Sequence, residues 1–154
     1  MLGIAEGTIP NLEAMTHEVR GAGLAGVVDS PVLGHYNSMT LSLTWRSVTG
    51  DISVLNTPQA HNLDLYASLK RYNAGLGQYV TEQLHVYCKA LPKTLTTGNL
   101  VVGDVMGTQM EFELLYVKIS LDGVTKIELD KYNYICRIDG TDYLAGVRSN
   151  LGMM

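Results

Sequence analysis

The feature that most constrains the fold is a pair of long alternating segments joined by a short turn. Apolar residues recur at every second position between residues 60 and 72, and again between residues 78 and 91. The segment between them, Asn73 to Gly77, contains Gly75 and Gly77. A period of two is typical of a strand with one buried face, so the pair predicts a long β-hairpin. Pro92 has no N–H to donate to a neighbouring strand, and we expect it to end the second strand.

Two further segments show strand character. From Ser38 to Arg46 apolar residues alternate with threonine and serine, which predicts a half-buried strand. From Gln109 to Leu121 the sequence is again extended, but apolar residues fall on both alternating sets. A strand that is apolar on both faces needs to be covered on both sides, so we expect a partner on each face of this segment.

The C-terminal third reads as short strands separated by tight turns. Asp122-Gly123 and Asp139-Gly140 are typical hairpin turns. They bound two expected strands, residues 124–130 and 132–138. A short helix is expected around residues 143–148.

The remaining segments are less regular. We expect one or two helical turns at residues 51–56 and an extended stretch at residues 12–20. Residues 93–108 show no periodicity and predict a loop, whose length indicates a functional or partner-bound segment. The chain is thus expected to be one domain, residues 1–154, of mainly antiparallel β structure. It would be a sandwich or barrel-like fold with long hairpins and one or two short helices.

Composition limits the classes of function. Charged residues make up 17% of the chain, below the roughly 25% that is typical, which indicates a surface covered by copies of the chain or by partners. The net charge of −4 provides no basic surface for gripping nucleic acid. Cys88 and Cys136 lie in alternating apolar runs, and we expect them to be buried free thiols. No signal peptide or membrane-spanning segment is expected.

The residues that usually carry chemistry form no recognisable site. The histidines His17, His35, His61 and His85 have no metal-ligand spacing, and His61 and Asp64 would point to opposite faces of a strand. No nucleophile elbow or phosphate-binding glycine loop is present. We therefore expect no catalytic site, no metal and no cofactor, and a small hydrolase is the weakest reading.

The nine tyrosines are dispersed along the chain, a pattern that suits protein interfaces better than a ligand platform. From the residues alone, one alternative stays open, namely a small β-barrel module that binds protein or carbohydrate. A self-assembling protein is expected to give concentration-dependent polymers, whereas a binding module is expected to be a monomer with one aromatic patch.

Several short segments, in their order and spacing, resemble the major tail tube proteins of contractile phage tails and R-type bacteriocins. These segments are Ile9-Pro10-Asn11-Leu12-Glu13, Arg20-Gly21-Ala22-Gly23, Met39–Trp45, His61–Ala90, Ile127-Glu128-Leu129-Asp130, Ile138-Asp139-Gly140-Thr141-Asp142 and Arg148-Ser149-Asn150-Leu151-Gly152. The resemblance covers nearly the whole chain. It also implies a further strand-forming segment before residues 2–7, where this sequence starts at Met1.

The resemblance implies a structural protomer that forms hexameric rings, and the rings stack into a rigid tube. Strands from six copies would line a continuous inner barrel inside a contractile sheath. The tube would be driven through a target cell envelope, and DNA would pass through the lumen only in a phage. Implied partners are the sheath protein, a baseplate or tube initiator, a tape-measure protein and a terminator. The particle would be assembled in the bacterial cytoplasm and found in a phage tail or a bacteriocin.

Candidate assembly residues follow from this reading. The expected subunit contacts are Leu2, Ile4, Ile9, Arg20, Leu24, Leu95, Leu100, Val101, Tyr143, Arg148 and Leu151. Arg148 is hypothesised to pair with an acid of a neighbouring subunit. The expected lumen-facing acids are Glu82, Glu111 and Glu113, since an acidic wall would repel DNA phosphates and let a polyanion slide through.

Overall fold

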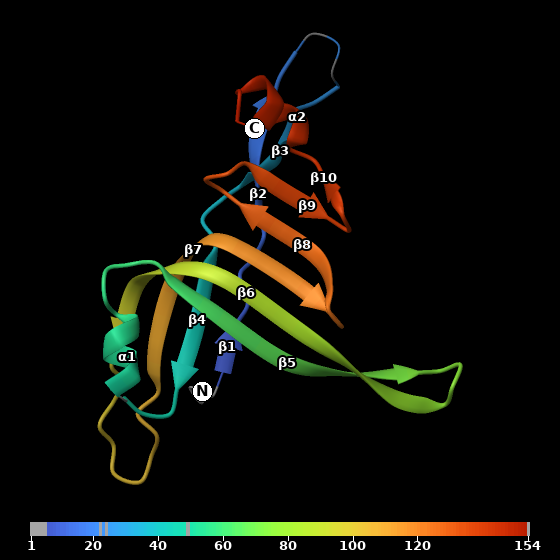
Figure 1. Cartoon of the computed structure of the whole chain (residues 1–154). Helices are drawn as coiled ribbons and strands as arrows, with labels where there is room; N and C mark the ends of the chain where they lie inside the picture. The colour runs from blue at the N-terminus through green and yellow to red at the C-terminus, as the bar shows by residue number, and fades with distance from the viewer. Residues whose placement is uncertain (1–5, 22, 24, 49, 154) are drawn as a thin grey trace.

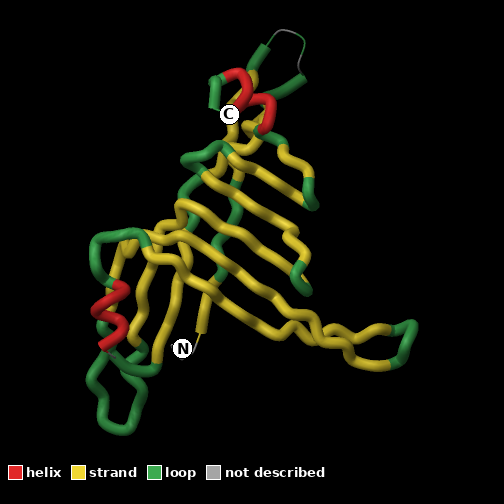
Figure 2. The backbone as a smooth tube through the Cα atoms, viewed as in Figure 1, coloured by secondary structure: helices red, strands yellow, loops and turns green. Residues whose placement is uncertain are grey.

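The structure, a computed structural model, describes residues 6–21, 23, 25–48 and 50–153. The chain is mainly β, as the alternating segments predict: of the described residues, 57% lie in strands and 8% in helices (Figures 1 and 2). The elements, in chain order, are β1 (Glu6–Thr8), β2 (Ala14–Val19), β3 (Val28–Tyr36), β4 (Thr40–Trp45), α1 (Gly50–Leu55), β5 (His61–Asn73), β6 (Gln78–Thr96), β7 (Thr108–Leu121), β8 (Val124–Asp130), β9 (Ile135–Ile138), β10 (Thr141–Asp142) and α2 (Ala145–Asn150).

Strand β7 is the centre of an eight-stranded antiparallel sheet. One edge of β7 pairs with β6 along nearly its whole length. The other edge pairs first with β4, up to Glu113, and then with β8, from Tyr116 onward. The sheet therefore branches at this point: β4 continues to β1, β8 continues to β9 and β10, and β5 extends the sheet beyond β6.

An irregularity in the middle of β7 explains its unusual sequence. Lys89 pairs with Tyr116 and Ala90 pairs with Leu114, so Leu115 is an extra residue without a partner in β6. The extra residue shifts the alternation by one position. Phe112 before the irregularity and Val117 after it consequently face the same core, and both are fully buried. The expectation that β7 needs cover on both faces is therefore wrong for most of the strand, because Val117 and Ile119 lie on the same face as Phe112. Leu115 alone of these apolar residues lies on the opposite face.

The second strand of the long hairpin extends further than expected. β6 continues through Pro92 to Thr96, so the loop covers residues 97–107 rather than 93–108. Pairing with β5 ends at Ala90, and the β6–β7 register shifts between Pro92 and Thr94. Pro92 is tolerated because β6 has a partner on only one edge there, at a point where the ladder is already irregular.

The alternation predicted one strand over residues 132–138, but only residues 135–138 form a strand. Residues 131–134 form a turn in which Asp130 Oδ1 accepts hydrogen bonds from the N–H groups of Tyr132 (3.0 Å) and Asn133 (2.9 Å). Tyr134 has a φ of 51°, so the strand β9 begins only at Ile135. An aspartate that hydrogen-bonds the backbone two and three residues on competes with strand pairing.

The N-terminal region contains a two-stranded sheet that only partly follows the sequence reading. The extended stretch expected at residues 12–20 is β2, whereas its partner β3 was not predicted. Pro31 and Gly34 interrupt β3, and its residues are mostly exposed. A strand without a buried face leaves no alternation in the sequence.

One face of the main sheet carries the hydrophobic core. Its fully buried members come mainly from β4, β6 and β7, and include Met39, Leu41, Val86, Cys88, Met110, Phe112, Leu114 and Val117. Ile52 and Leu55 of α1 pack on this core, and Leu144 before α2 closes it near β9. Both expected helices are confirmed, as are the buried free thiols Cys88 and Cys136.

Gly34 gives a direct test of the contact between β3 and the start of α2. Its φ is +68°, and a Cβ at this position would lie 2.5 Å from Leu144 side-chain atoms. We expect Gly34→Ala to lower the free energy of unfolding by about 2 kcal/mol or more, because left-handed strain and overpacking add together. Urea denaturation followed by circular dichroism measures the change. Gly26→Ala is the matched control, since its Cβ would meet no atom within 4 Å; equal stability of the two variants would contradict this packing.

Candidate assembly surfaces

The hairpin β5–β6 extends beyond the rest of the sheet as an arm. Pairing of β6 with β7 begins only at Leu84, so residues 69–82, called the arm, form a two-stranded ribbon that projects from the body (Figure 1). Tyr72, Leu76 and Tyr79 are about 57–64% exposed. An isolated two-stranded hairpin is only marginally stable in water, and among the described residues no third strand pairs with the arm.

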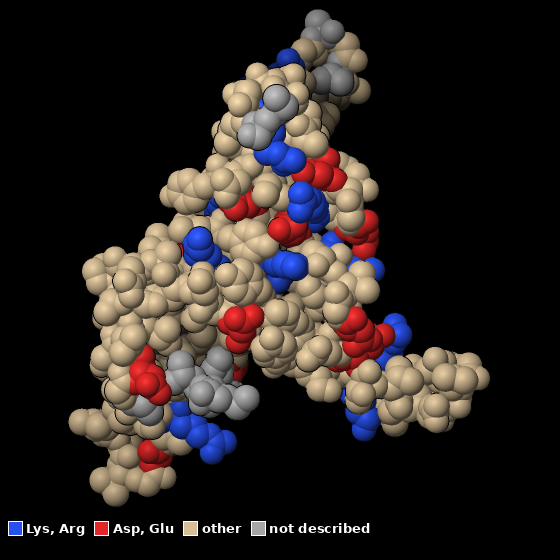
Figure 3. All heavy atoms as spheres, viewed as in Figure 1, with Lys and Arg blue, Asp and Glu red and all other residues tan. Residues whose placement is uncertain are grey.

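Contacts within the arm stiffen it without covering it. The rings of Tyr72 and Tyr79 meet edge to face at 5.3 Å, and Lys70 Nζ lies 4.4 Å from the centre of the Tyr79 ring. Arg71 and Glu82 form an ion pair at 2.6 Å. On the face visible in Figure 3, the charged side chains of the arm gather at its base and the end is free of charge. The arm thus presents a stiff tip without charged side chains, with the aromatic pair and Lys70 directly behind it.

Strand β5 has one unpaired edge. Among the described residues, β5 pairs only with β6, along all thirteen residues from His61 to Asn73. Unpaired N–H and C=O groups along a strand edge are a template for another strand. The edge contains no proline, so another strand could pair along its full length.

The loop of residues 97–107, called the apolar loop, is held in shape but presents its side chains to solvent. Its backbone is fixed by hydrogen bonds from Asn99 N to Met106 O (2.9 Å) and from Met106 N to Arg46 O (3.0 Å). Leu100 is 89% exposed and Val102 is fully exposed. A loop whose backbone is held by hydrogen bonds and whose aliphatic side chains are exposed to solvent is typical of a surface that another protein covers.

The β2–β3 sheet is a third exposed apolar surface. Met15, Val28, Val32 and Leu33 are all between 38% and 61% exposed. Figure 1 shows this sheet extending to the end of the molecule opposite the apolar loop. The protein therefore offers exposed apolar segments at both of its ends and along the arm.

The residues expected at subunit contacts are spread over several of these surfaces. Those with exposed side chains are Ile9, Arg20, Leu100, Val101, Tyr143 and Leu151. Leu95 is half-buried and packs on the core instead. Leu2, Ile4 and Leu24 lie outside the described residues. The sequence reading missed the arm tip and the free β5 edge, although the length of the hairpin relative to its neighbours could have indicated both.

Arg148 finds its acid within its own chain. Arg148 Nη2 lies 2.5 Å from Asp142 Oδ2, and Nη1 donates to the Tyr134 carbonyl at 2.7 Å. Within its own chain this arginine holds α2 against β10 and the β8–β9 turn. Its pairing with an acid of a neighbouring subunit stays a prediction. The hydrogen bond from Arg148 lowers the pKa of Asp142, outweighing the opposing effect of burial.

This pair continues a chain of polar contacts across the C-terminal strands. Arg137 Nη1 donates to Glu128 Oε2 at 3.0 Å, and its Nε lies 3.7 Å from Asp142 Oδ2. Tyr116 donates its hydroxyl to Glu128 Oε1 at 2.8 Å. Burial, followed by the contact with Glu128, raises the pKa of Tyr116. The network ties β7, β8, β9, β10 and α2 together on the polar face of the sheet.

The three acids expected to face a lumen do not share one face. Glu111 and Glu113 pair with polar residues of β4 on the face opposite the core. Glu82 belongs to the other alternating set of β6, the one that contains Leu84 and Val86, and pairs with Arg71. Glu113 accepts a hydrogen bond from Ser38 (2.5 Å) and lies 3.5 Å from Lys131 Nζ. These contacts lower the pKa of Glu113 although its burial acts to raise it.

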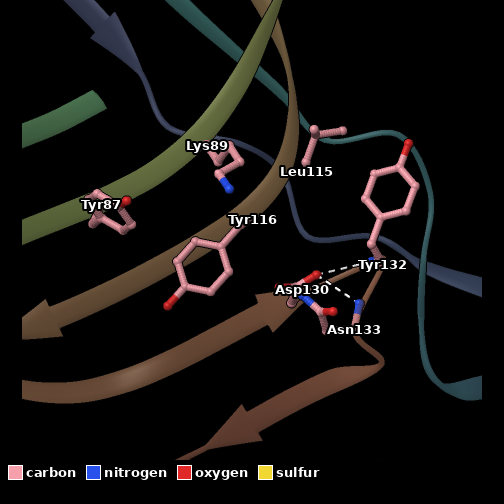
Figure 4. Close-up of a pocket in the computed structure, with 7 residues that line it drawn as sticks. All are labelled: Tyr87, Lys89, Leu115, Tyr116, Asp130, Tyr132 and Asn133. Carbon is pink, nitrogen blue, oxygen red and sulfur yellow. Dashed lines mark hydrogen bonds between the residues drawn. The ribbon is translucent and has the colours of Figure 1, made fainter. Parts of the chain in front are cut away.

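A hollow of about 460 Å³ lies where the sheet branches. Figure 4 shows its lining, called the tyrosine hollow: Tyr87, Lys89, Leu115, Tyr116, Asp130, Tyr132 and Asn133. The irregularity at Leu115 turns two consecutive residues of β7 to this face, and the Asp130 turn brings Tyr132 beside them. The tyrosines that look dispersed in the sequence are here brought together, because the register aligns Tyr87 near Tyr116 with ring centres 5.7 Å apart.

Within the described residues, no group of three or more potential metal ligands was found. The same part of the chain contains no helix that is both long and apolar enough to cross a membrane. His61 and Asp64 do point apart, and Asp64 instead pairs with His85 at 2.7 Å across the β5–β6 ladder. The exposed apolar surfaces are thus the features of the described structure that most clearly indicate a function, namely contact with another chain.

The Arg148–Asp142 pair predicts a dependence of stability on pH. The folded pKa of Asp142 lies below its ordinary value of 3.8, so its contribution is present above that value and is lost as the pH falls through the folded pKa. Arg148→Met should therefore destabilise the protein at neutral pH and make its stability less dependent on pH below about 4. Urea midpoints from about pH 6 to about pH 2 measure this. Arg71→Met, which removes an exposed ion pair, is the control and should keep the wild-type profile.

Comparisons with known proteins identify the family of this chain. The family described as "Phage tail tube protein FII" matches residues 1–152. The tail tube protein of Escherichia phage P2 is 25% identical over 158 aligned residues, which cover 98% of this chain and 88% of that protein.

A solved structure is similar in fold. It is the cryo-EM structure of the sheath/tube terminator of the extracellular contractile injection system PVC in its extended state. The TM-score is 0.51 at 18% identity, over 77% of this chain and 86% of that chain, and this likeness concerns the fold alone. Because the family match extends over nearly the full sequence, the chain belongs to the phage tail tube protein FII family, and the resemblance found in its sequence is confirmed.

Proposed function

We propose that this protein is the protomer of the inner tube of a contractile injection machine. Six copies form a closed ring, and the rings stack into a hollow tube that a contractile sheath surrounds. The observation that carries the proposal is the arm with its free β5 edge, in a chain that belongs to a tail tube family. A ring of neighbouring protomers would cover the edge and support the arm.

The arm supplies the lateral contact between neighbours in the ring. A two-stranded ribbon that projects from the body can reach an adjacent copy, where the backbone of the free edge pairs and the aromatic tip is buried. The contact joins different surfaces of the two copies, which is the arrangement that generates closed rings when the rotation closes. The same protomer stacked on its other surfaces gives a tube of indefinite length.

The polar face of the sheet beside β4 and the first half of β7 is the proposed wall of the channel. This part of the face carries Glu111 and Glu113 together with Lys131, whose Nζ lies 3.5 Å from Glu113, so fixed charges of both signs line it. With six copies that each carry a net charge of −4, the assembled wall would not bind DNA tightly, because tight binding requires many uncompensated basic contacts. In a phage, DNA would slide through; in a bacteriocin, the open tube would itself be the channel.

The further partners follow from the same role. A baseplate initiator would template the first ring, a tape-measure protein would occupy the lumen during assembly, and a terminator would cap the last ring. The exposed surfaces that the ring leaves uncovered are available to the sheath. The particle would be assembled in the bacterial cytoplasm.

Electron microscopy of the purified protein tests the proposal. Negative-stain images over a concentration series should show hollow rings or tubes with six-fold end views. Persistent single protomers at every concentration would instead favour a small binding module.

The arm can be tested separately. We expect the double variant Leu76→Glu and Tyr79→Glu to remain folded, because both side chains are exposed, and to lose ring formation, because charge would be buried at the contact. Circular dichroism measures the fold, and size-exclusion chromatography with light scattering measures assembly. Gln59→Glu, in an exposed loop before β5, adds a negative charge away from the arm and serves as the control. Normal rings from the arm variant would rule out the proposed lateral contact.

A further inference from the structure

The tyrosine hollow has the composition of a binding surface but no occupant within its own chain. Tyr132 is 70% exposed at its rim, and the half-buried Leu115 forms part of its apolar floor. None of the ion pairs between described residues involves Lys89, which lines the hollow (Figure 4). The hollow also contains one acid, Asp130, whose carboxylate already accepts hydrogen bonds from Tyr132 N, Asn133 N and Asn133 Nδ2. Lys89 is therefore the charge left for a partner, and the tyrosines with this cation suit a segment that combines aliphatic side chains with one carboxylate.

We propose that the tyrosine hollow binds the apolar loop of a second copy of this chain, and that this contact joins successive rings. The inference rests on the proposed tube function and names the surfaces that make the axial contact. Leu100, Val101 and Val102 of the loop would enter the hollow, and Asp104 would pair with Lys89.

The chemistry of the loop matches the hollow. Its three consecutive aliphatic side chains are 59–104% exposed, so their burial provides the main driving force. Asp104 is the single acidic residue between positions 97 and 107. Its Oδ1 accepts a hydrogen bond from Val105 N at 2.8 Å, which fixes the carboxylate beside the apolar apex. The loop therefore presents an aliphatic surface together with one carboxylate that can pair with Lys89.

The placement of the two surfaces suits stacking. The loop precedes β7 at one end of the sheet, whereas the hollow lies beyond the middle of β7, at the β8–β9 turn (Figure 1). A contact between two different surfaces that lie apart along the molecule is heterologous and can repeat without closing. That is the geometry an axial contact needs.

The arm tip fits the hollow less well. Lys70 and Arg71 lie beside its aromatic residues, and the nearest acid, Glu82, already pairs with Arg71. Placing these cations beside Lys89 would bring like charges together, which disfavours the contact. The apolar loop provides the opposite charge, so the observations favour it.

Charge reversal provides the first test. Lys89→Glu and Asp104→Lys should each raise the protein concentration needed for tube growth by about tenfold or more, while single rings still form. The double variant should restore tubes, because it re-forms the pair with opposite signs. Lys93→Glu, an exposed lysine on the same strand outside the hollow, makes the same change in charge and should leave tubes intact.

Cross-linking provides the second test. Oxidation of assembled Val102→Cys, Tyr132→Cys double-variant protein should give a ladder of covalently linked chains on a non-reducing gel, whereas either single variant should not. The native thiols Cys88 and Cys136 are buried and should not contribute. A ladder supports the loop-in-hollow contact, and tubes without a ladder contradict it.

The outcomes separate the two proposals. If wild-type protein forms no rings, the tube function itself is wrong. If it forms tubes but the Lys89 and Asp104 variants also do so at wild-type concentrations, the function stands and the contact assigned to the hollow is wrong. Tubes lost in the single variants and recovered in the double variant would support both.

Discussion

The extra residue at Leu115 is the constraint on which the rest of the fold depends. It shifts the alternation of β7, so that both halves of the strand bury their apolar side chains against one core. At the same point β7 exchanges β4 for β8 along one edge, which branches the sheet. The same shift turns Leu115 and Tyr116 outward and opens the tyrosine hollow. One irregularity thus sets the core, the topology and a candidate contact surface.

Some regions of the protomer are well packed, whereas others leave apolar side chains exposed to solvent. The core around β4, β6 and β7 is fully buried, and the polar network from Tyr116 to Arg148 holds the C-terminal strands and α2 together. The arm, the apolar loop and the β2–β3 sheet instead expose aliphatic and aromatic side chains. This division fits the proposed self-assembly, in which a rigid body carries surfaces that neighbouring copies would bury.

The charged side chains also divide between the packed body and the exposed surfaces. Arg148, Arg137 and Lys131 pair with acids of their own chain and stabilise the body. The apolar loop has one charge of its own, Asp104, and in the proposed axial contact Lys89 and Asp104 act mainly to select the partner and its register. Burial of aliphatic side chains would supply the affinity, and the charge pair would supply specificity.

Strands with one buried face and their turns can be predicted from local sequence. The hairpin of β5 and β6, the strand β4 and the turns at Asp122 and Asp139 follow from local periodicity and turn residues, and the order of motifs indicated the family. Four features emerge only when the chain is folded: the face that Val117 takes, the end of β6, the pairing of Arg148 with Asp142, and the shared hollow of Tyr87, Tyr116 and Tyr132. These features depend on register and on pairing between segments far apart in the chain, and local periodicity contains no information about either.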